Sequence, residues 1–106
     1  EDLSRKVDLV LSVPNLRRFV CSAWTNLERV VEAVGDRYAI EWRQLASEVI
    51  FSADLAHVRA HLERGLKLAQ GSRIMVVLRE VETVAGKPQR LAEWVSMARE
   101  CAEKYA

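Results

Sequence analysis

Apolar residues recur along the chain with two spacings, one typical of helices and one typical of buried strands. The clearest helical spacing covers residues 52–71, where an apolar side chain returns every three or four positions. These positions are Leu55, Val58, Leu62, Leu66 and Ala69. Residues 74–81 read IMVVLREV, and the first five are apolar without interruption. Such a run predicts a parallel strand that is covered on both faces.

Weaker versions of both patterns predict the remaining elements. They indicate a helix over residues 2–13, a strand over 16–22, a strand over 38–42 and a last helix that starts near Pro88. The inner stripe of that last helix is predicted to be Leu91, Trp94, Val95, Ala98 and Ala102. Residues 43–48 contain no proline, so the sequence also allows an additional helical turn there.

Capping signals predict where two of the helices begin. Thr25 is the expected N-cap of a helix that ends at Gly35, with Glu28 three positions later completing a capping box. Ser52 is the expected N-cap of the helix over 52–71, and Asp54 would face the positive end of its dipole.

The order of these elements predicts one α/β domain over residues 1–106. Three strands alternate with four helices, and strands separated by helices of this length pair in parallel through right-handed crossovers. Because the chain opens on Glu1 rather than Met, a segment upstream of Glu1 is one possibility.

Composition narrows the classes of partner. Acidic and basic residues are interspersed, and the formal net charge is +1, so no nucleic-acid partner is expected. The longest apolar run is only five residues, so no membrane partner is expected either. Cys21 and Cys101 are far apart in sequence, which favours two free, buried thiols and a cytoplasmic location.

The carboxyl ends of the strands are where a ligand would bind in a parallel sheet. The candidate ligand-binding residues there are Trp42, Arg43, Arg79, Glu80 and Glu82. An arginine beside carboxylates can hold an anionic small molecule or tune a general acid. The alternative is that these charges are solvated or paired with one another.

For other residues that could carry chemistry, a structural role is favoured over a functional one. Glu41 and Arg43 share one face of their strand. They could mark an interface, or they could be charges that protect an edge strand from aggregation, and we prefer the edge-strand interpretation. His57 and His61 have the spacing of two metal ligands but do not belong to the apolar stripe of their helix. We therefore expect them to lie on an exposed helix face and to bind no metal ion.

The sequence also lacks the short motifs that bind common cofactors. Its four glycines are isolated, and neither a phosphate-binding loop nor a nucleophile elbow is present, so no cofactor is expected. The three tryptophans, Trp24, Trp42 and Trp94, are expected to pack rather than to stack on a ligand.

Several segments carry a family resemblance. They are PNLRRFVCSAW at 14–24, NLER at 26–29, VGDRY at 34–38, LREVETV at 78–84 and GKPQRL at 86–91, followed by Trp94, Ala98 and Arg99. Together they resemble the C-terminal part of the uroporphyrinogen decarboxylase-like superfamily, which includes corrinoid-dependent methyltransferases. The resemblance implies part of a TIM barrel, a (β/α)₈ fold of which this chain supplies about three strands and upstream sequence would supply the rest. The arginine and aspartate motifs of that family's N-terminal half, and the His/Cys metal pattern of the methyltransferases, have no counterpart here.

Two functional hypotheses follow. The first is a fragment or small relative of such a barrel, non-catalytic alone, that covers its exposed sheet by forming a homo-oligomer or binding a partner. In this hypothesis Ile40, Val76 and Leu78 are the side chains that need cover. The alternative is a decarboxylase-like or methyltransferase-like enzyme whose site is completed by a second copy or by upstream sequence.

Overall fold

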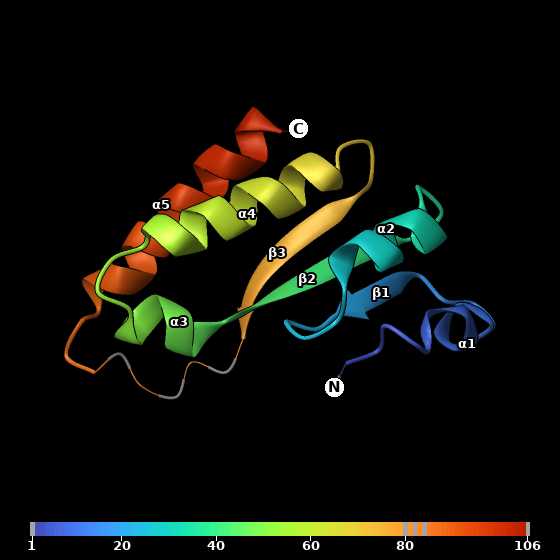
Figure 1. Ribbon diagram of the computed structural model, residues 1–106, viewed down its shortest axis with the longest axis horizontal. Coiled ribbons are helices and arrows are strands. Elements are labelled where there is room, and N and C mark those ends of the chain that lie inside the picture. The colour runs from blue at the N-terminus through green and yellow to red at the C-terminus, as the bar shows by residue number, and fades with distance from the viewer. Residues whose placement is uncertain (1, 80, 82, 84, 106) are drawn as a thin grey trace.

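A computed structural model describes residues 2–79, 81, 83 and 85–105 of this protein. Its sheet has three parallel strands in the spatial order β1-β2-β3 (Figure 1). Their bounds are Arg18–Cys21 for β1, Ala39–Leu45 for β2 and Ile74–Arg79 for β3. The predicted α/β fold with three parallel strands is therefore confirmed.

The described residues form five helices, one more than the sequence predicts. Their bounds are Val7–Leu11 for α1, Leu27–Val34 for α2, Ala46–Phe51 for α3, Ala56–Leu68 for α4 and Gln89–Lys104 for α5. The additional helix is α3, which follows β2 without a loop and buries Val49 and Ile50. The first helix is shorter than predicted, because only Val7 of its apolar residues is fully buried.

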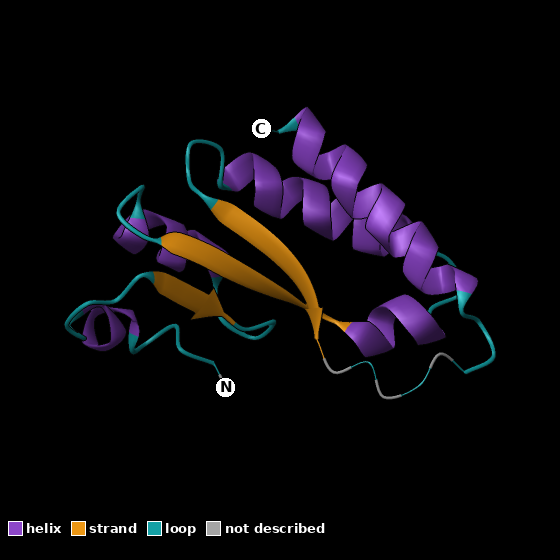
Figure 2. Ribbon diagram, turned by 180° about the vertical axis from the view of Figure 1, so that it is seen from behind, coloured by secondary structure: helices purple, strands orange, loops and turns teal. Residues whose placement is uncertain are grey.

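All connections place their helices on the same face of the sheet. The strand order follows the chain order, so the right-handed crossovers through α2 and α4 lie on one side. Figure 2, seen from behind, shows the three strands with no helix in front of them. The sheet therefore has one helix-covered face and one face that we call the open face.

The strand register assigns each side chain to a face, since side chains alternate along a strand. On the covered side, Cys21 pairs with Trp42, which pairs with Val76. Ile40 and Leu78 lie an even number of positions from Trp42 and Val76, so they face the covered side too. The expectation that Ile40, Val76 and Leu78 lie on an uncovered face is therefore wrong. The open face instead carries Arg18, Val20, Ala39, Glu41, Arg43, Leu45, Met75, Val77 and Arg79.

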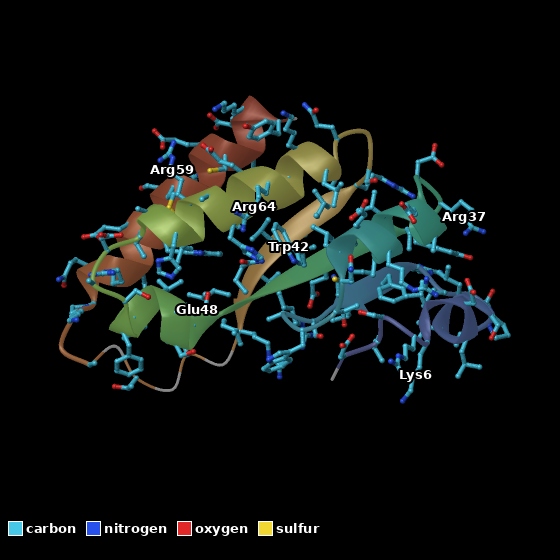
Figure 3. The ribbon with its side chains drawn as sticks, in the orientation of Figure 1. Lys6, Arg37, Trp42, Glu48, Arg59 and Arg64 are labelled. Atoms are coloured by element: carbon cyan, nitrogen blue, oxygen red, sulfur yellow. The ribbon has the colours of Figure 1, made fainter. Side chains whose placement is uncertain are left out.

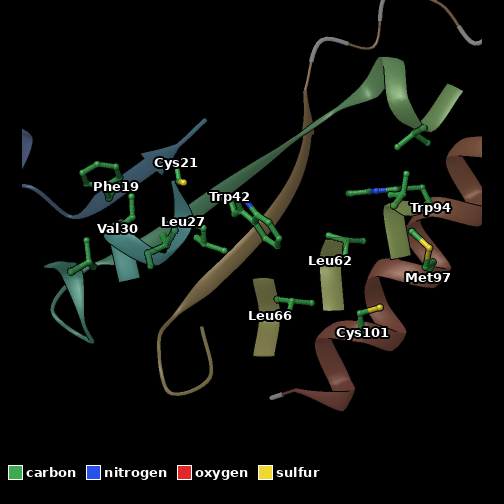
Figure 4. Close-up of a cluster of buried hydrophobic side chains, with 14 of the residues drawn as sticks. Phe19, Cys21, Leu27, Val30, Trp42, Leu62, Leu66, Trp94, Met97 and Cys101 are labelled. Atoms are coloured by element: carbon green, nitrogen blue, oxygen red, sulfur yellow. The ribbon is translucent and has the colours of Figure 1, made fainter. Parts of the chain in front are cut away.

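The core lies between the sheet and its helices. Figure 4 shows buried side chains that run from Phe19 on β1 through Trp42 to Cys101 on α5. Cys21 and Cys101 are both free and buried, as the sequence predicts. The inner stripe of α5 differs from the prediction: Met97 and Cys101 are buried with Trp94, whereas the predicted Val95 is exposed.

Both predicted N-caps are wrong. The α2 helix is capped by Asn26, whose Oδ1 accepts a hydrogen bond of 3.2 Å from the Arg29 backbone N–H. Thr25 is not free to cap, because its hydroxyl oxygen accepts from the Leu3 backbone N–H and lies 2.8 Å from Ser22 Oγ.

The α4 helix begins after Leu55 rather than at Ser52. The Asp54 carboxylate accepts a hydrogen bond from the Ala56 backbone N–H there, as expected of an acidic residue near a helix start. Among the described residues, no helix combines the length and apolar character that crossing a bilayer requires.

Candidate functional site

The carboxyl ends of β1 and β2 meet at one edge of the sheet, beside α3 and the first half of α4. The loop after β1 contributes Ala23, and the end of β2 contributes Gln44. Because β2 continues straight into α3, Glu48 is held one helical turn beyond the strand. This edge is where ligands bind in open parallel sheets.

The structure divides the predicted ligand-binding residues between the two faces of the sheet. Trp42 lies on the covered face, whereas Arg43 and Arg79 have the opposite parity and lie on the open face. Glu80 and Glu82 lie outside the described residues. The structure therefore does not bring Trp42 and the two arginines into one site.

Trp42 packs against α4 rather than standing in an open cleft. Its side chain is 3% exposed, and its ring lies 5.2 Å from the ring of His61, centroid to centroid, at 44°. Trp42 also lines a pocket of about 770 Å³ between α2 and α4, together with Leu27 and Arg64. The expectation that Trp42 and Trp94 pack is confirmed, whereas Trp24 is 53% exposed.

Arg43 forms part of a charge cluster on the open face. The Glu41 carboxylate lies 2.7 Å from Arg43 Nε and 3.6 Å from Arg18 Nη1. Glu41 is buried in spite of its position, since the arginines lie over it. The preferred interpretation of Glu41 and Arg43 as edge-strand charges is wrong, because β2 is the central strand of the sheet.

A second pocket, of about 320 Å³, opens at the carboxyl ends of β1 and β2. We call it the rim pocket. Its polar lining consists of Gln44, Glu48, His57, His61 and Arg64. Figure 3 shows where Glu48 on α3 and Arg64 on α4 lie relative to Trp42.

The polar groups of the rim pocket are largely without protein partners. Gln44 is 4% exposed, yet its Nε2 has no hydrogen-bond partner among the described residues. Within the described part of the chain, neither the Glu48 carboxylate nor the Arg64 guanidinium forms an ion pair or a hydrogen bond. Buried amide groups are nearly always hydrogen-bonded in native proteins, so Gln44 marks an unusual site.

The two histidines of α4 differ in environment. The pKa of His61 is lowered, mainly by partial burial against neighbouring groups and then by the charge of Arg64, while Glu48 acts in the opposite direction. These effects favour the neutral form of the His61 ring. His57 lies nearer the start of the helix, with Nε2 3.4 Å from Ser52 Oγ.

The prediction that both histidines lie on an exposed helix face is confirmed, although the ring of His61 also contacts Trp42. No group of three or more His, Cys, Asp and Glu side chains among the described residues is arranged to hold a metal ion.

The sequence pattern does not connect Gln44 with Glu48 or Arg64. Those two charges lie on separate helices, and one of the helices was not predicted. The available signal was the spacing of His57, His61 and Arg64, which share one side of α4 at intervals of four and three residues.

Comparison of the chain with protein-family models, with curated proteins and with solved structures found no match.

Proposed function

We propose that this chain is a non-catalytic association module, a piece or small relative of a uroporphyrinogen decarboxylase-like barrel. It acts by packing its open face against a second copy of itself. The observation that carries the proposal is the one-sided sheet: all three strands are parallel, and the described helices cover one face only. Parallel sheets occur almost only with both faces covered, so the open face calls for a partner.

The side chains of the open face fit a protein interface. Its centre is formed by Val20, Met75 and Val77 around the Glu41 carboxylate, which is already neutralised by arginines. Methionine and arginine are enriched at interfaces and lysine is depleted, and the described strand residues of this face include no lysine. Arg18 and Arg79 begin β1 and end β3, so they lie at opposite corners, as in a polar rim around an apolar centre.

A second copy is the occupant that the chain itself supplies. Its formal net charge is only +1, so two copies repel each other weakly. A two-fold arrangement would bury the same patch on both protomers, and each Met75 would then be covered by the partner's sheet. The two buried free thiols agree with a cytoplasmic setting for such a dimer.

The arrangement of the units supports the ancestry. Three consecutive strand-helix units with strands in chain order and helices on one side are the repeating plan of a (β/α)₈ barrel. In such a barrel the open face would line the interior, which is packed with side chains.

Sedimentation equilibrium tests this function. The wild-type chain is expected to be a dimer at micromolar concentration. Met75→Lys is expected to weaken the dimer at least about tenfold, because the interface would have to remove water from an additional ammonium group. Glu41, which pairs with Met75 in register, is already neutralised by Arg18 and Arg43. Val95→Lys is the matched control, since Val95 is 47% exposed against 46% for Met75 but lies on α5.

The proposal fails if the wild-type chain is monomeric at these concentrations. It fails equally if Val95→Lys dissociates the dimer and Met75→Lys does not.

A second candidate function, an enzyme completed by oligomerisation, is favoured by one observation. Arg43 and Arg79 lie near each other on the open face, because Arg79 pairs with Leu45 two positions along β2. A second copy could complete an anion site around them. Calorimetric titration with the tetrapyrrole carboxylate uroporphyrin tests this reading: heat of binding that Arg79→Gln abolishes supports it, and no heat with the wild type rejects it.

A further inference from the structure

The rim pocket stands apart from the open face and has no role in the proposed association. It lies mainly on the covered side of the sheet, since Gln44 has the parity of Trp42, and its helical walls are α3 and α4. Within its lining, Leu45 has the parity of the open face and borders the pocket where β2 passes into α3. It also lies at the carboxyl ends of β1 and β2, where parallel sheets bind ligands. Its volume of about 320 Å³ is that of a small-molecule site.

The polar groups of the pocket are arranged by charge. Arg64 supplies a cation and Glu48 an anion, and neither is paired with another described residue. Both lie close enough to His61 to influence its charge state, Arg64 in one direction and Glu48 in the other. Two opposite charges that share a pocket without pairing leave space for a ligand that carries both signs.

The buried amide of Gln44 is a second, independent observation that points to a ligand. Its amide is buried in the pocket wall, and the two N–H donors of its Nε2 have no acceptor within the part of the chain that the structure describes. An unsatisfied buried donor is costly in an empty site and is compensated when a ligand supplies an acceptor. A ligand carboxylate that bridges Gln44 and Arg64 meets this need.

The rest of the lining is apolar. Ala23, Leu45 and Ala60 complete the wall, so the part of the ligand away from the charges is expected to be hydrocarbon.

We propose that the rim pocket binds a zwitterionic α-amino acid with an apolar side chain. Its carboxylate lies against Arg64 and the Gln44 amide, its ammonium group lies against Glu48, and its side chain contacts Ala23, Leu45 and Ala60. A guanidinium binds a carboxylate through parallel N–H donors, which fixes the orientation of the ligand. The ring of His61 lines this pocket and contacts the ring of Trp42.

An NMR titration of the ¹⁵N-labelled chain tests the site. The probes are L-leucine, N-acetyl-L-leucine, which lacks the ammonium group, and L-leucinamide, which lacks the carboxylate. L-leucine is expected to shift the Gln44 side-chain amide signals saturably, together with the backbone signals of Glu48 and Arg64. The two derivatives are expected to bind at least about tenfold more weakly, because each leaves one charge of the pocket unpaired.

Two variants and a control refine the test. Arg64→Gln and Gln44→Leu are each expected to weaken L-leucine binding about tenfold or more. Gln44→Leu is expected to fold at least as stably as the wild type, since it removes an unsatisfied buried donor. Arg59→Gln is the control: Arg59 also lies on α4 but pairs with Glu63 and Glu100 away from the pocket.

The proposal is overturned if L-leucine causes no saturable shift, or if all three probes bind alike. It is also overturned if Gln44→Leu retains the wild-type affinity. Met75→Lys is expected to keep L-leucine binding, so failure of the dimer and failure of the pocket are separate outcomes.

Discussion

Trp42 lies directly over Gly65, so that α4 approaches the sheet through the indole ring with no side chain between them. A Cβ added at Gly65 would overlap the six-membered ring, 2.6 Å from Cζ3 and 2.8 Å from Cζ2. Gly65 is itself buried in the interior of α4. The identity of this residue is therefore set by the close approach of an aromatic ring rather than by backbone conformation.

Gly65→Ala is expected to destabilise the protein by about 1–3 kcal/mol, because overpacking of a close contact costs that much. The sign of this change in stability is informative, since replacing glycine by alanine in an unobstructed helix stabilises the helix by about 1 kcal/mol. Chemical denaturation measures the difference. In a Trp42→Phe background, whose shorter ring removes the overlapping atoms, the same substitution is expected to cost less or to stabilise. An equal cost in both backgrounds would contradict the contact.

His61 reports on the charges of the rim pocket. Its pKa lies below the ordinary 6.5, and the neighbouring groups that act on it are Arg64, Glu48 and His57. Arg64→Gln is expected to raise the midpoint of the His61 titration, because a repelling cation is lost. Glu48→Gln is expected to lower it further, because an attracting anion is lost. The imidazole Hε1 signal in ¹H NMR follows both titrations.

If Arg64→Gln and Glu48→Gln shift the midpoint of the His61 titration in the same direction, one of these two charges does not lie beside His61 as described. Arg59→Gln again serves as the control, since Arg59 does not act on this ring.

The Cys21 thiol makes stability sensitive to alkaline pH. Burial raises its pKa from the ordinary 9.0 to about 11. Between these values the unfolded chain loses the proton and the folded chain keeps it, so the stabilising contribution is complete below pH 9 and is lost as pH rises toward 11. The whole loss amounts to about 2–3 kcal/mol of the free energy of unfolding, of which about 2 kcal/mol has occurred by pH 10.5. Urea denaturation at pH 8 and near pH 10.5 measures it.

Cys21→Ala is the comparison, because the variant lacks the thiol while keeping the lysines and tyrosines that also titrate in this range. Its free energy of unfolding is expected to fall less between the two pH values. An identical fall in both proteins would show that the Cys21 thiol is not buried as described.

Much of the fold follows from patterns within the sequence, because each strand-helix unit is built from local contacts. The stripe from Leu55 to Leu66 and the apolar run that begins at Ile74 correctly predict a helix and a parallel strand. The α3 helix is different. It depends on burying Val49 and Ile50 against the rest of the molecule, a tertiary effect that no periodicity within six residues reveals.

The faces of the sheet were harder to predict, for a related reason. The run from Ile74 to Leu78 is apolar at every position, so it does not tell which alternate set contacts the helices. Trp42 decides the question, since its contact with Gly65 fixes the covered face. The rim pocket could not be predicted because Gln44, Glu48 and Arg64 come from three elements that meet only in the folded chain.

The dimer through the open face is tested most directly at the two methionines. Met75 lies on the open face and is exposed, whereas Met97 is buried on α5 and serves as an internal reference. In a chain with ¹³C-labelled methionine methyl groups, a soluble paramagnetic agent broadens exposed methyl signals. As protein concentration rises, the Met75 signal is expected to become protected while the Met97 signal stays unchanged. A Met75 methyl that remains fully accessible at every concentration would contradict the proposed association.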